Sequence, residues 1–118
     1  MGKIKILFLA AFALFGVQPA YAATSCNGAI LSAHVSSDGS VLIRGSWRSD
    51  YTQICNISSI WKGIPLEVCA LWAAKADAAI ATGHSVTIYY SADFACTAIP
   101  SYGTSPAPTY LMLNSTGV

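Results

Sequence analysis

The chain has 118 residues, of which 54% are hydrophobic and only 9% are charged. Residues 23–118 carry four basic and five acidic side chains, a formal net charge of −1. Proteins that bind nucleic acids through phosphates need clustered Lys and Arg, and four scattered cations do not provide such a cluster. The composition therefore argues against a nucleic-acid-binding role.

The first 22 residues have the pattern of a cleavable export signal. Lys3 and Lys5 are followed by an uncharged apolar run of 12 residues, Ile6–Val17, and then by the small residues Ala20 and Ala22. Small residues at these two positions favour signal-peptidase cleavage near Ala22. A retained anchor is the alternative, but 12 apolar residues are too few to cross a bilayer core of about 30 Å as a helix. We expect a secreted or periplasmic protein without a membrane span, with one domain at residues 23–118.

The beginning of this domain predicts two strands joined by a tight turn. Asn27–Val35 and Ser40–Trp47 are apolar, partly alternating runs, and turn-forming residues lie between them. They indicate a β-hairpin closed around Asp38-Gly39. Tyr51–Ile57 fits a third strand, which a polar loop follows.

The segment between Pro65 and Gly83 predicts an amphipathic helix. Proline suits the first turn of a helix, and glycine suits the position after its last residue. The residues expected on the buried face recur at helical spacing, and they are Cys69, Trp72, Ala73, Ala76 and Ile80.

The residues after the helix predict two more strands. His84–Ser91 alternates strongly, with Val86, Ile88 and Tyr90 on one side. The remainder predicts a short strand at Ala92–Ile99, an irregular loop at Pro100–Tyr110 and a last short strand at Leu111–Leu113. Three strands, a helix and two main strands follow the order of the OB-fold, a mainly β five-stranded barrel with its helix between strands three and four.

All four cysteines, Cys26, Cys55, Cys69 and Cys96, lie beyond the export signal. An even number of cysteines in a small exported domain typically forms disulfides, and four cysteines allow three pairings. No spacing is C-x-x-C, and two histidines make a zinc site a poor alternative. We therefore expect two disulfides, no metal site and no cofactor.

Three segments resemble parts of a known family of secreted proteins. Thr82–Tyr90 is similar to a T-G-Q-x-V-R-I segment that follows an amphipathic helix in that family, and Gly28–His34 resembles its first strand. Cys55 and Ser58–Trp61 resemble its third-strand cysteine and the stretch after it. The family comprises the B subunits of subtilase cytotoxin and of the related typhoid-toxin type. The resemblance runs from about Asn27 to Ser91.

This resemblance implies a non-catalytic OB-fold subunit that forms a ring-shaped homopentamer, binds glycans and accompanies a catalytic toxin subunit. In the family the third-strand cysteine pairs with a cysteine on the second strand, and Ser40–Trp47 holds none. Cys69 is therefore the candidate partner of Cys55, and Cys26 then pairs with Cys96.

The resemblance also implies ligand contacts. Tyr90 matches a tyrosine that contacts the sugar in the family, and Asn27 stands where the family has a serine that contacts sialic acid. We expect Tyr90 and Asn27 to lie close together on the first and fourth strands. From the residues themselves, Arg44 and Arg48 either hold an anionic group of the ligand or belong to a solvated strand edge.

The sequence predicts no enzyme. A catalytic base or nucleophile needs a further group that holds it, and neither His34, near Asp38, nor His84 has such a context. Trp47 and Trp61 are either exposed recognition residues or packing residues at the barrel ends. A glycan-binding subunit is the favoured function. A stand-alone periplasmic or secreted protein-binding or inhibitor module is the alternative, and a minor hydrolase is the third hypothesis.

Overall fold

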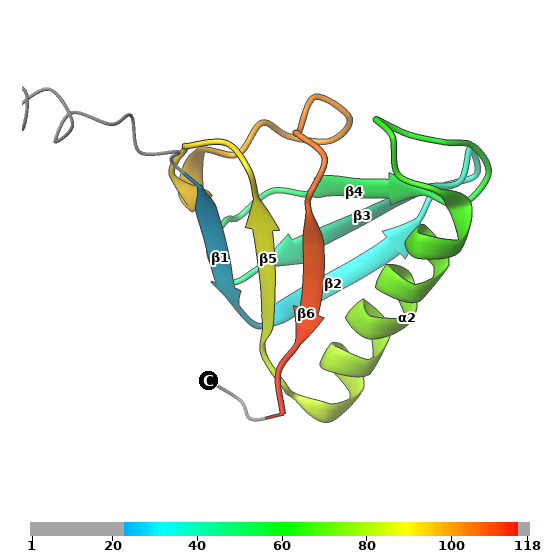
Figure 1. Ribbon diagram of the computed structural model, residues 1–118. Helices are drawn as coiled ribbons and strands as arrows, with labels where there is room; N and C mark the ends of the chain where they lie inside the picture. Colours follow the sequence, from blue (N-terminus) through cyan, green and yellow to red (C-terminus); the bar gives the residue numbers. More distant parts are fainter. Residues whose placement is uncertain (1–22, 116–118) are drawn as a thin grey trace, which may run out of the picture.

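A computed structural model describes residues 23–115 (Figure 1), and the export signal predicted at residues 1–22 lies outside them. The elements follow in the order β1 (Thr24–Gly28), β2 (Ile30–Val35), β3 (Ser40–Gly45), β4 (Thr52–Asn56), α2 (Leu66–Thr82), β5 (Val86–Tyr90), η1 (Cys96–Ala98) and β6 (Tyr110–Leu113). The predicted mainly β class with one long helix before the last strands is confirmed for these residues. Among them, no helix has the length and apolar character needed to cross a membrane.

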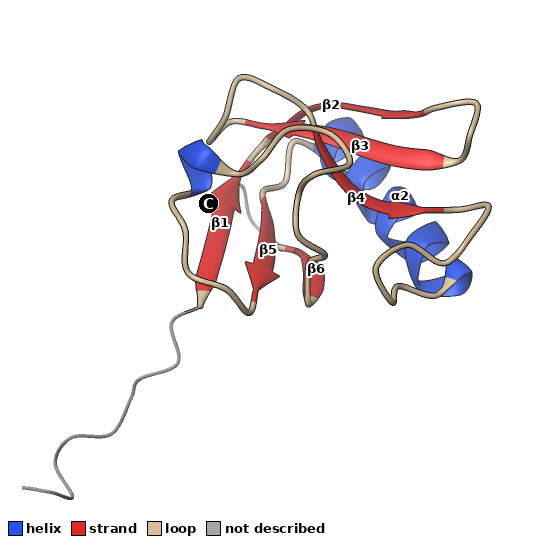
Figure 2. Cartoon of the chain, turned by 90° about the horizontal axis from the view of Figure 1, so that it is seen from above, coloured by secondary structure: helices blue, strands red, loops and turns tan. Residues whose placement is uncertain are grey.

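The strands form two antiparallel sheets of three. In one sheet β5 lies between β1 and β6, and in the other β3 lies between β2 and β4. Figure 2 shows the two sheets as separate layers, with α2 below the second sheet and beside β6. The helix packs against both β2 and β6, so it links the two sheets along one side.

The first predicted strand, Asn27–Val35, is in fact divided between two strands. β1 pairs with β5 and β2 pairs with β3, so the chain changes sheets at Ala29. The Ala29 N–H donates to Ser46 Oγ at 3.1 Å, and the Ala29 carbonyl accepts from the Ser46 N–H at 2.9 Å. Ser46 thus satisfies the backbone groups of Ala29, which belongs to neither strand.

A closed five-stranded barrel is not observed among residues 23–115. Closure requires strand pairing to continue around the whole sheet. Between β4 and the segment before β6 there is only one parallel bridge, Thr52 to Tyr102, outside the named strands. The described chain therefore forms two open sheets, where the sequence predicted a barrel.

The hairpin turn at Asp38-Gly39 is confirmed. Gly39 has a φ of +91°, which a residue with a Cβ rarely adopts. Asp38 Oδ1 accepts a hydrogen bond from the Ser40 N–H at 2.9 Å, and this bond lowers the pKa of the Asp38 carboxyl. The ionised carboxylate thus stabilises the turn between β2 and β3.

The predicted helix is also confirmed, with Pro65 before it and Gly83 after it. Gly83 has a φ of 73°, and its N–H donates to the Ala79 carbonyl at 2.9 Å. The buried side chains are Cys69, Trp72, Ala76 and Ala79. Ile80, predicted on the buried face, is 44% exposed. The buried stripe advances by three, four and three residues, and it therefore reaches Ala79 and passes Ile80.

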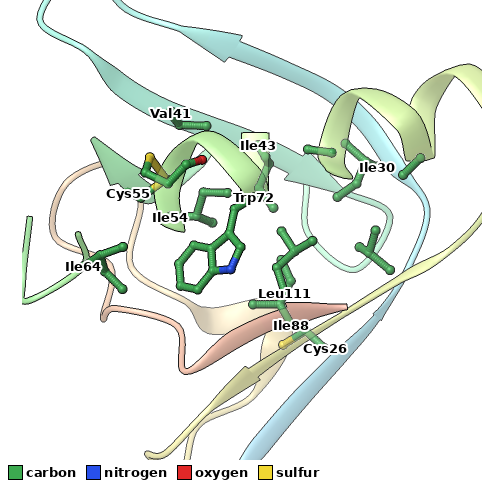
Figure 3. Close-up of a cluster of buried hydrophobic side chains, with 14 of the residues drawn as sticks. Cys26, Ile30, Val41, Ile43, Ile54, Cys55, Ile64, Trp72, Ile88 and Leu111 are labelled. Atoms are coloured by element: carbon green, nitrogen blue, oxygen red, sulfur yellow. A yellow bond between two sulfur atoms is a disulfide. The ribbon is translucent and has the colours of Figure 1, made fainter. Parts of the chain in front are cut away.

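Both favoured disulfides, Cys26–Cys96 and Cys55–Cys69, are formed. The first joins β1 to η1, and the second joins β4 to the beginning of α2. Figure 3 shows Cys55 close to Ile54 and Trp72 in the buried cluster between sheets and helix. The two bonds therefore tie the helix and the segment after β5 to the sheets.

The predicted strand at Ala92–Ile99 is wrong, because only η1, a short 3-10 helix, forms there. β5 already pairs with β1 and β6 on its two sides, so the segment that follows it finds no free edge on that strand. Thr24 holds the segment instead. Its Oγ1 donates to the Ala92 carbonyl at 2.8 Å and accepts from the Phe94 N–H at 3.1 Å.

Candidate ligand-binding site

Asn27 and Tyr90 do not share one site. They lie on the neighbouring strands β1 and β5, as expected, but Asn27 pairs with Thr87, and Tyr90 pairs with Thr24. Because side chains alternate between the two faces of a strand, Asn27 and Tyr90 project from opposite faces of the sheet. Asn27 is exposed to solvent, whereas Tyr90 is only 1% exposed.

Tyr90 is a core residue. Its ring meets that of Phe94 edge-on, with the ring centroids 5.0 Å apart, and burial raises the pKa of its hydroxyl. A surface ligand cannot stack on a ring that is 1% exposed, so the predicted sugar contact at Tyr90 is corrected. The signal for this was present in the sequence. Tyr90 shares its face of the strand with the apolar residues Val86 and Ile88, and that face is the one that packs inward.

Arg48 holds a loop in place. Its guanidinium donates to the Ile99 carbonyl and, at 2.9 Å, to Ser101 Oγ. Ser101 Oγ donates to Asp50 Oδ2 at 2.7 Å, and this hydrogen bond lowers the pKa of the Asp50 carboxyl, as does the nearby charge of Arg48. Arg48 thus has a structural role in the segment around Ser101, and its role as a ligand contact stays a prediction.

Arg44 lies on β3, whereas Asn27 and Tyr90 lie in the other sheet. Its Nε donates to Ser32 Oγ at 3.3 Å, directly across the β2–β3 pair. The four predicted ligand contacts therefore do not form one site. Asn27 and Arg44 lie on different sheets, Tyr90 lies in the core, and Arg48 holds a loop.

The two histidines have partners other than acidic side chains. The ring of His34 contacts Tyr51, with centroids 4.9 Å apart, while Asp38 accepts its hydrogen bond from Ser40. His84 follows the helix, where its N–H donates to Thr82 Oγ1 at 3.4 Å. Within residues 23–115, no three His, Cys, Asp or Glu side chains are grouped as metal ligands.

Trp47 and Trp61 are half-buried and pack against the core. Of the two alternatives, exposed recognition residues or packing residues, the structure favours packing. The Trp47 ring lies so close to Gly45 that a Cβ at residue 45 would come within 2.4 Å of it. Lys62 covers Trp61, with Nζ 4.7 Å from the ring centroid. Neither indole forms an open platform.

A pair of stacked tyrosines lies on the outer face of the β1–β5–β6 sheet. Tyr89 and Tyr110 are paired across β5 and β6, with ring centroids 5.1 Å apart and ring planes within 3° of parallel. Tyr110 is 41% exposed, and Tyr89 is half-buried. Ser25 pairs with Tyr89 on its other side, so these three residues form one row across the sheet.

A second row on the same face contains Asn27, Thr87 and Met112. Asn114 Nδ2 donates to Thr87 Oγ1 at 3.3 Å, and Thr87 Oγ1 donates to Asn27 Oδ1 at 2.5 Å. This relay occupies the Asn27 oxygen, and the amide NH₂ makes no hydrogen bond within residues 23–115. The two rows together form the tyrosine face, which consists of Ser25, Asn27, Thr87, Tyr89, Tyr110 and Met112.

The tyrosine face combines two kinds of contact. The rings of Tyr89 and Tyr110 can pack against an apolar surface, and the Asn27 amide can donate hydrogen bonds next to them. Tyr89 and Tyr110 were not predicted as contacts. Strand alternation places Tyr89 on the face opposite Tyr90, but only the fold brings Tyr110 beside it.

Comparison with protein-family profiles, with curated proteins and with solved structures finds no match to this chain.

Proposed function

We propose that this protein is an exported, non-catalytic binding module that recognises a glycan through the tyrosine face. The Tyr89–Tyr110 pair beside the oriented amide of Asn27 carries this proposal. A sugar ring presents an apolar C–H surface next to hydroxyl groups, and tyrosine presents an apolar ring with a polar end. The tyrosine face offers both types of contact on one surface.

Two further observations support an exported protein. The leading residues have the composition of an export signal, and the cysteines of the described chain form two disulfides. Disulfides persist in oxidising compartments such as the periplasm or the extracellular space.

Tyr89→Ala is expected to weaken glycan binding at least about tenfold, because it removes the central ring of the tyrosine face and unstacks Tyr110. Asn27→Ala is expected to weaken it about twofold to tenfold, since one neutral hydrogen bond contributes about 0.5–1.5 kcal/mol. A glycan array identifies the best ligand of the parent protein, and titration of each variant with that glycan gives the Kd.

The matched control is Tyr102→Ala. Tyr102 is 52% exposed, and it lies in the loop before β6, outside the tyrosine face. Its removal should leave the Kd for the glycan unchanged. A parent protein that binds nothing on the array, or a Tyr89→Ala variant with full affinity, would contradict the proposal.

The resemblance to toxin B subunits supports a further part of the proposal, a ring of identical chains that accompanies a catalytic subunit. On the outward side of α2, Ala70 and Ala74 are exposed, and Leu71 is 63% exposed. Small residues let two helices approach closely, and the sheet edges at β2 and β6 can pair with neighbouring copies.

Light scattering of the purified protein is therefore expected to give a mass several times that of one chain. Leu71→Glu should shift this mass toward the single chain, because it places a charge in the helix contact, while Glu67→Gln on the same helix should not. A single-chain mass for the parent protein at high micromolar concentration would exclude the ring.

One observation favours the alternative, a protein-binding or inhibitor module. Ile57, Ile60 and Leu66, in and around the connection from β4 to α2, are 41%, 71% and 38% exposed. Exposed apolar residues that lie together often mark protein interfaces. A negative glycan array would shift the weight to this alternative, with Ile60 as its first contact to test.

A further inference from the structure

A second polar cluster lies on the outer face of the β2–β3–β4 sheet. Arg44 Nε donates to Ser32 Oγ at 3.3 Å, and Ser32 Oγ lies 2.9 Å from the Tyr51 hydroxyl. Val41 and Ile43 of the same strand as Arg44 face the core, so strand alternation places Arg44 on the opposite face. Ser32, Arg44 and Tyr51 thus meet at the surface from β2, β3 and the residue before β4.

Arg44 has no counter-charge among residues 23–115. It is half-buried, and its one hydrogen bond within this range goes to the neutral Ser32 hydroxyl. Asp50, the acidic residue beside Tyr51 in the chain, accepts hydrogen bonds from the Tyr51 N–H and from Ser101 Oγ instead. A partly desolvated guanidinium is stabilised by an anion, and its planar fork fits the oxygens of an oxyanion.

The hydroxyl groups of Ser32 and Tyr51 add one further donor. Together they carry two protons, and the hydrogen bond between them uses one. Neither hydroxyl donates to any other group within residues 23–115, so the second proton is available to a ligand. If Tyr51 donates to Ser32, the Ser32 oxygen accepts from both Tyr51 and Arg44, and its own proton is the free one.

His34 lies beside this cluster and contacts Tyr51. Its ring meets the Tyr51 ring edge-on, with centroids 4.9 Å apart and ring planes inclined by 64°. This contact places the Tyr51 ring beside β2, where the Tyr51 hydroxyl meets Ser32.

We propose that Arg44, Ser32 and Tyr51 form a binding site for an oxyanion, a carboxylate, sulfate or phosphate group. The terminal nitrogens of Arg44 bind two of its oxygens, and the free hydroxyl proton of the Ser32–Tyr51 pair binds an oxygen as well. This site lies on a different sheet from the tyrosine face, and it does not depend on glycan binding there.

An NMR titration tests the site. Sodium acetate, sodium sulfate and sodium phosphate are added in separate titrations, and sodium chloride keeps the ionic strength constant in each. The Arg44 Nε–H signal is expected to shift and saturate with at least one anion, and so are the backbone N–H signals of Ser32 and Tyr51, which remain present in the Arg44 variants. Arg44→Gln should weaken this binding at least about tenfold, because it removes charge-assisted hydrogen bonds. Ser32→Ala combined with Tyr51→Phe removes both hydroxyl groups, and with them the free proton, and should weaken the binding about twofold to tenfold. Lys75→Gln, which removes an exposed charge on α2, is the matched control and should have no effect.

The three anions distinguish a planar carboxylate from a tetrahedral sulfate or phosphate, and saturation with any of them supports the site. Shifts that rise linearly with every salt, or binding that is equally weakened by Lys75→Gln, would overturn it. Arg44→Lys keeps the charge without the planar fork, and it provides the same test if Arg44→Gln does not fold. Loss of anion binding with unchanged glycan affinity in an Arg44 variant would separate this site from the tyrosine face.

Discussion

Replacing Cys26 and Cys96 together by alanine is expected to lower the free energy of unfolding by about 4.4 kcal/mol. The bond spans 70 residues of sequence, so its loss releases a long loop of the unfolded chain. Alanine avoids placing a polar group at position 26, where the side chain is 1% exposed. Urea unfolding followed by tryptophan fluorescence measures the change.

The second disulfide provides the comparison. Cys55–Cys69 spans 14 residues, and the same loop-entropy relation gives about 3 kcal/mol for its removal. A larger loss from Cys55→Ala with Cys69→Ala than from the Cys26 and Cys96 pair would contradict this order. It would show that the link between β4 and α2 stabilises the native packing more than loop closure alone does.

Trp72→Ala is expected to destabilise the fold by about 3–5 kcal/mol. Trp72 is 7% exposed, and Figure 3 shows its indole among side chains from both sheets, including Ile54 and Leu111. Removal of this ring leaves a cavity where α2 meets the two sheets, and the surrounding residues can fill it only in part. Denaturant unfolding of the parent and the variant measures the difference.

Leu71→Ala is the matched control for Trp72→Ala. Leu71 precedes Trp72 on the same helix, but it is 63% exposed. In unfolding measured on the single chain, below the concentration at which copies associate, its replacement should therefore change the free energy of unfolding by at most about 0.5 kcal/mol. Equal effects of the two substitutions would mean that α2 does not bury the face that contains Trp72.

The sequence by itself determined the elements whose signals are local. The turn at Asp38-Gly39 needs a residue that tolerates a positive φ, and glycine at 39 provides it. Pro65 and Gly83 mark the ends of α2 because proline and glycine are both unfavourable inside a helix. The alternation in β5 follows from the two-residue period of a strand, which one short segment is sufficient to show.

The disulfide pairing needed more than local signals. The number of cysteines left three possibilities. Ser40–Trp47 holds no cysteine to match the second-strand cysteine of toxin B subunits, and this departure made Cys69 the candidate partner of Cys55. The structure contains this pairing.

Only the tertiary structure decided which residues share a surface. Arg48 holds a loop because Ile99 and Ser101, more than 50 positions along the chain, come to lie beside it. Ala92–Ile99 fails to form a strand because β1 and β6 already occupy both sides of β5. Tyr110 lies beside Tyr89 because β6 pairs with β5. Each outcome depends on contacts between segments that are distant in the sequence. The neighbours of a residue along the chain do not show which distant segment it will contact.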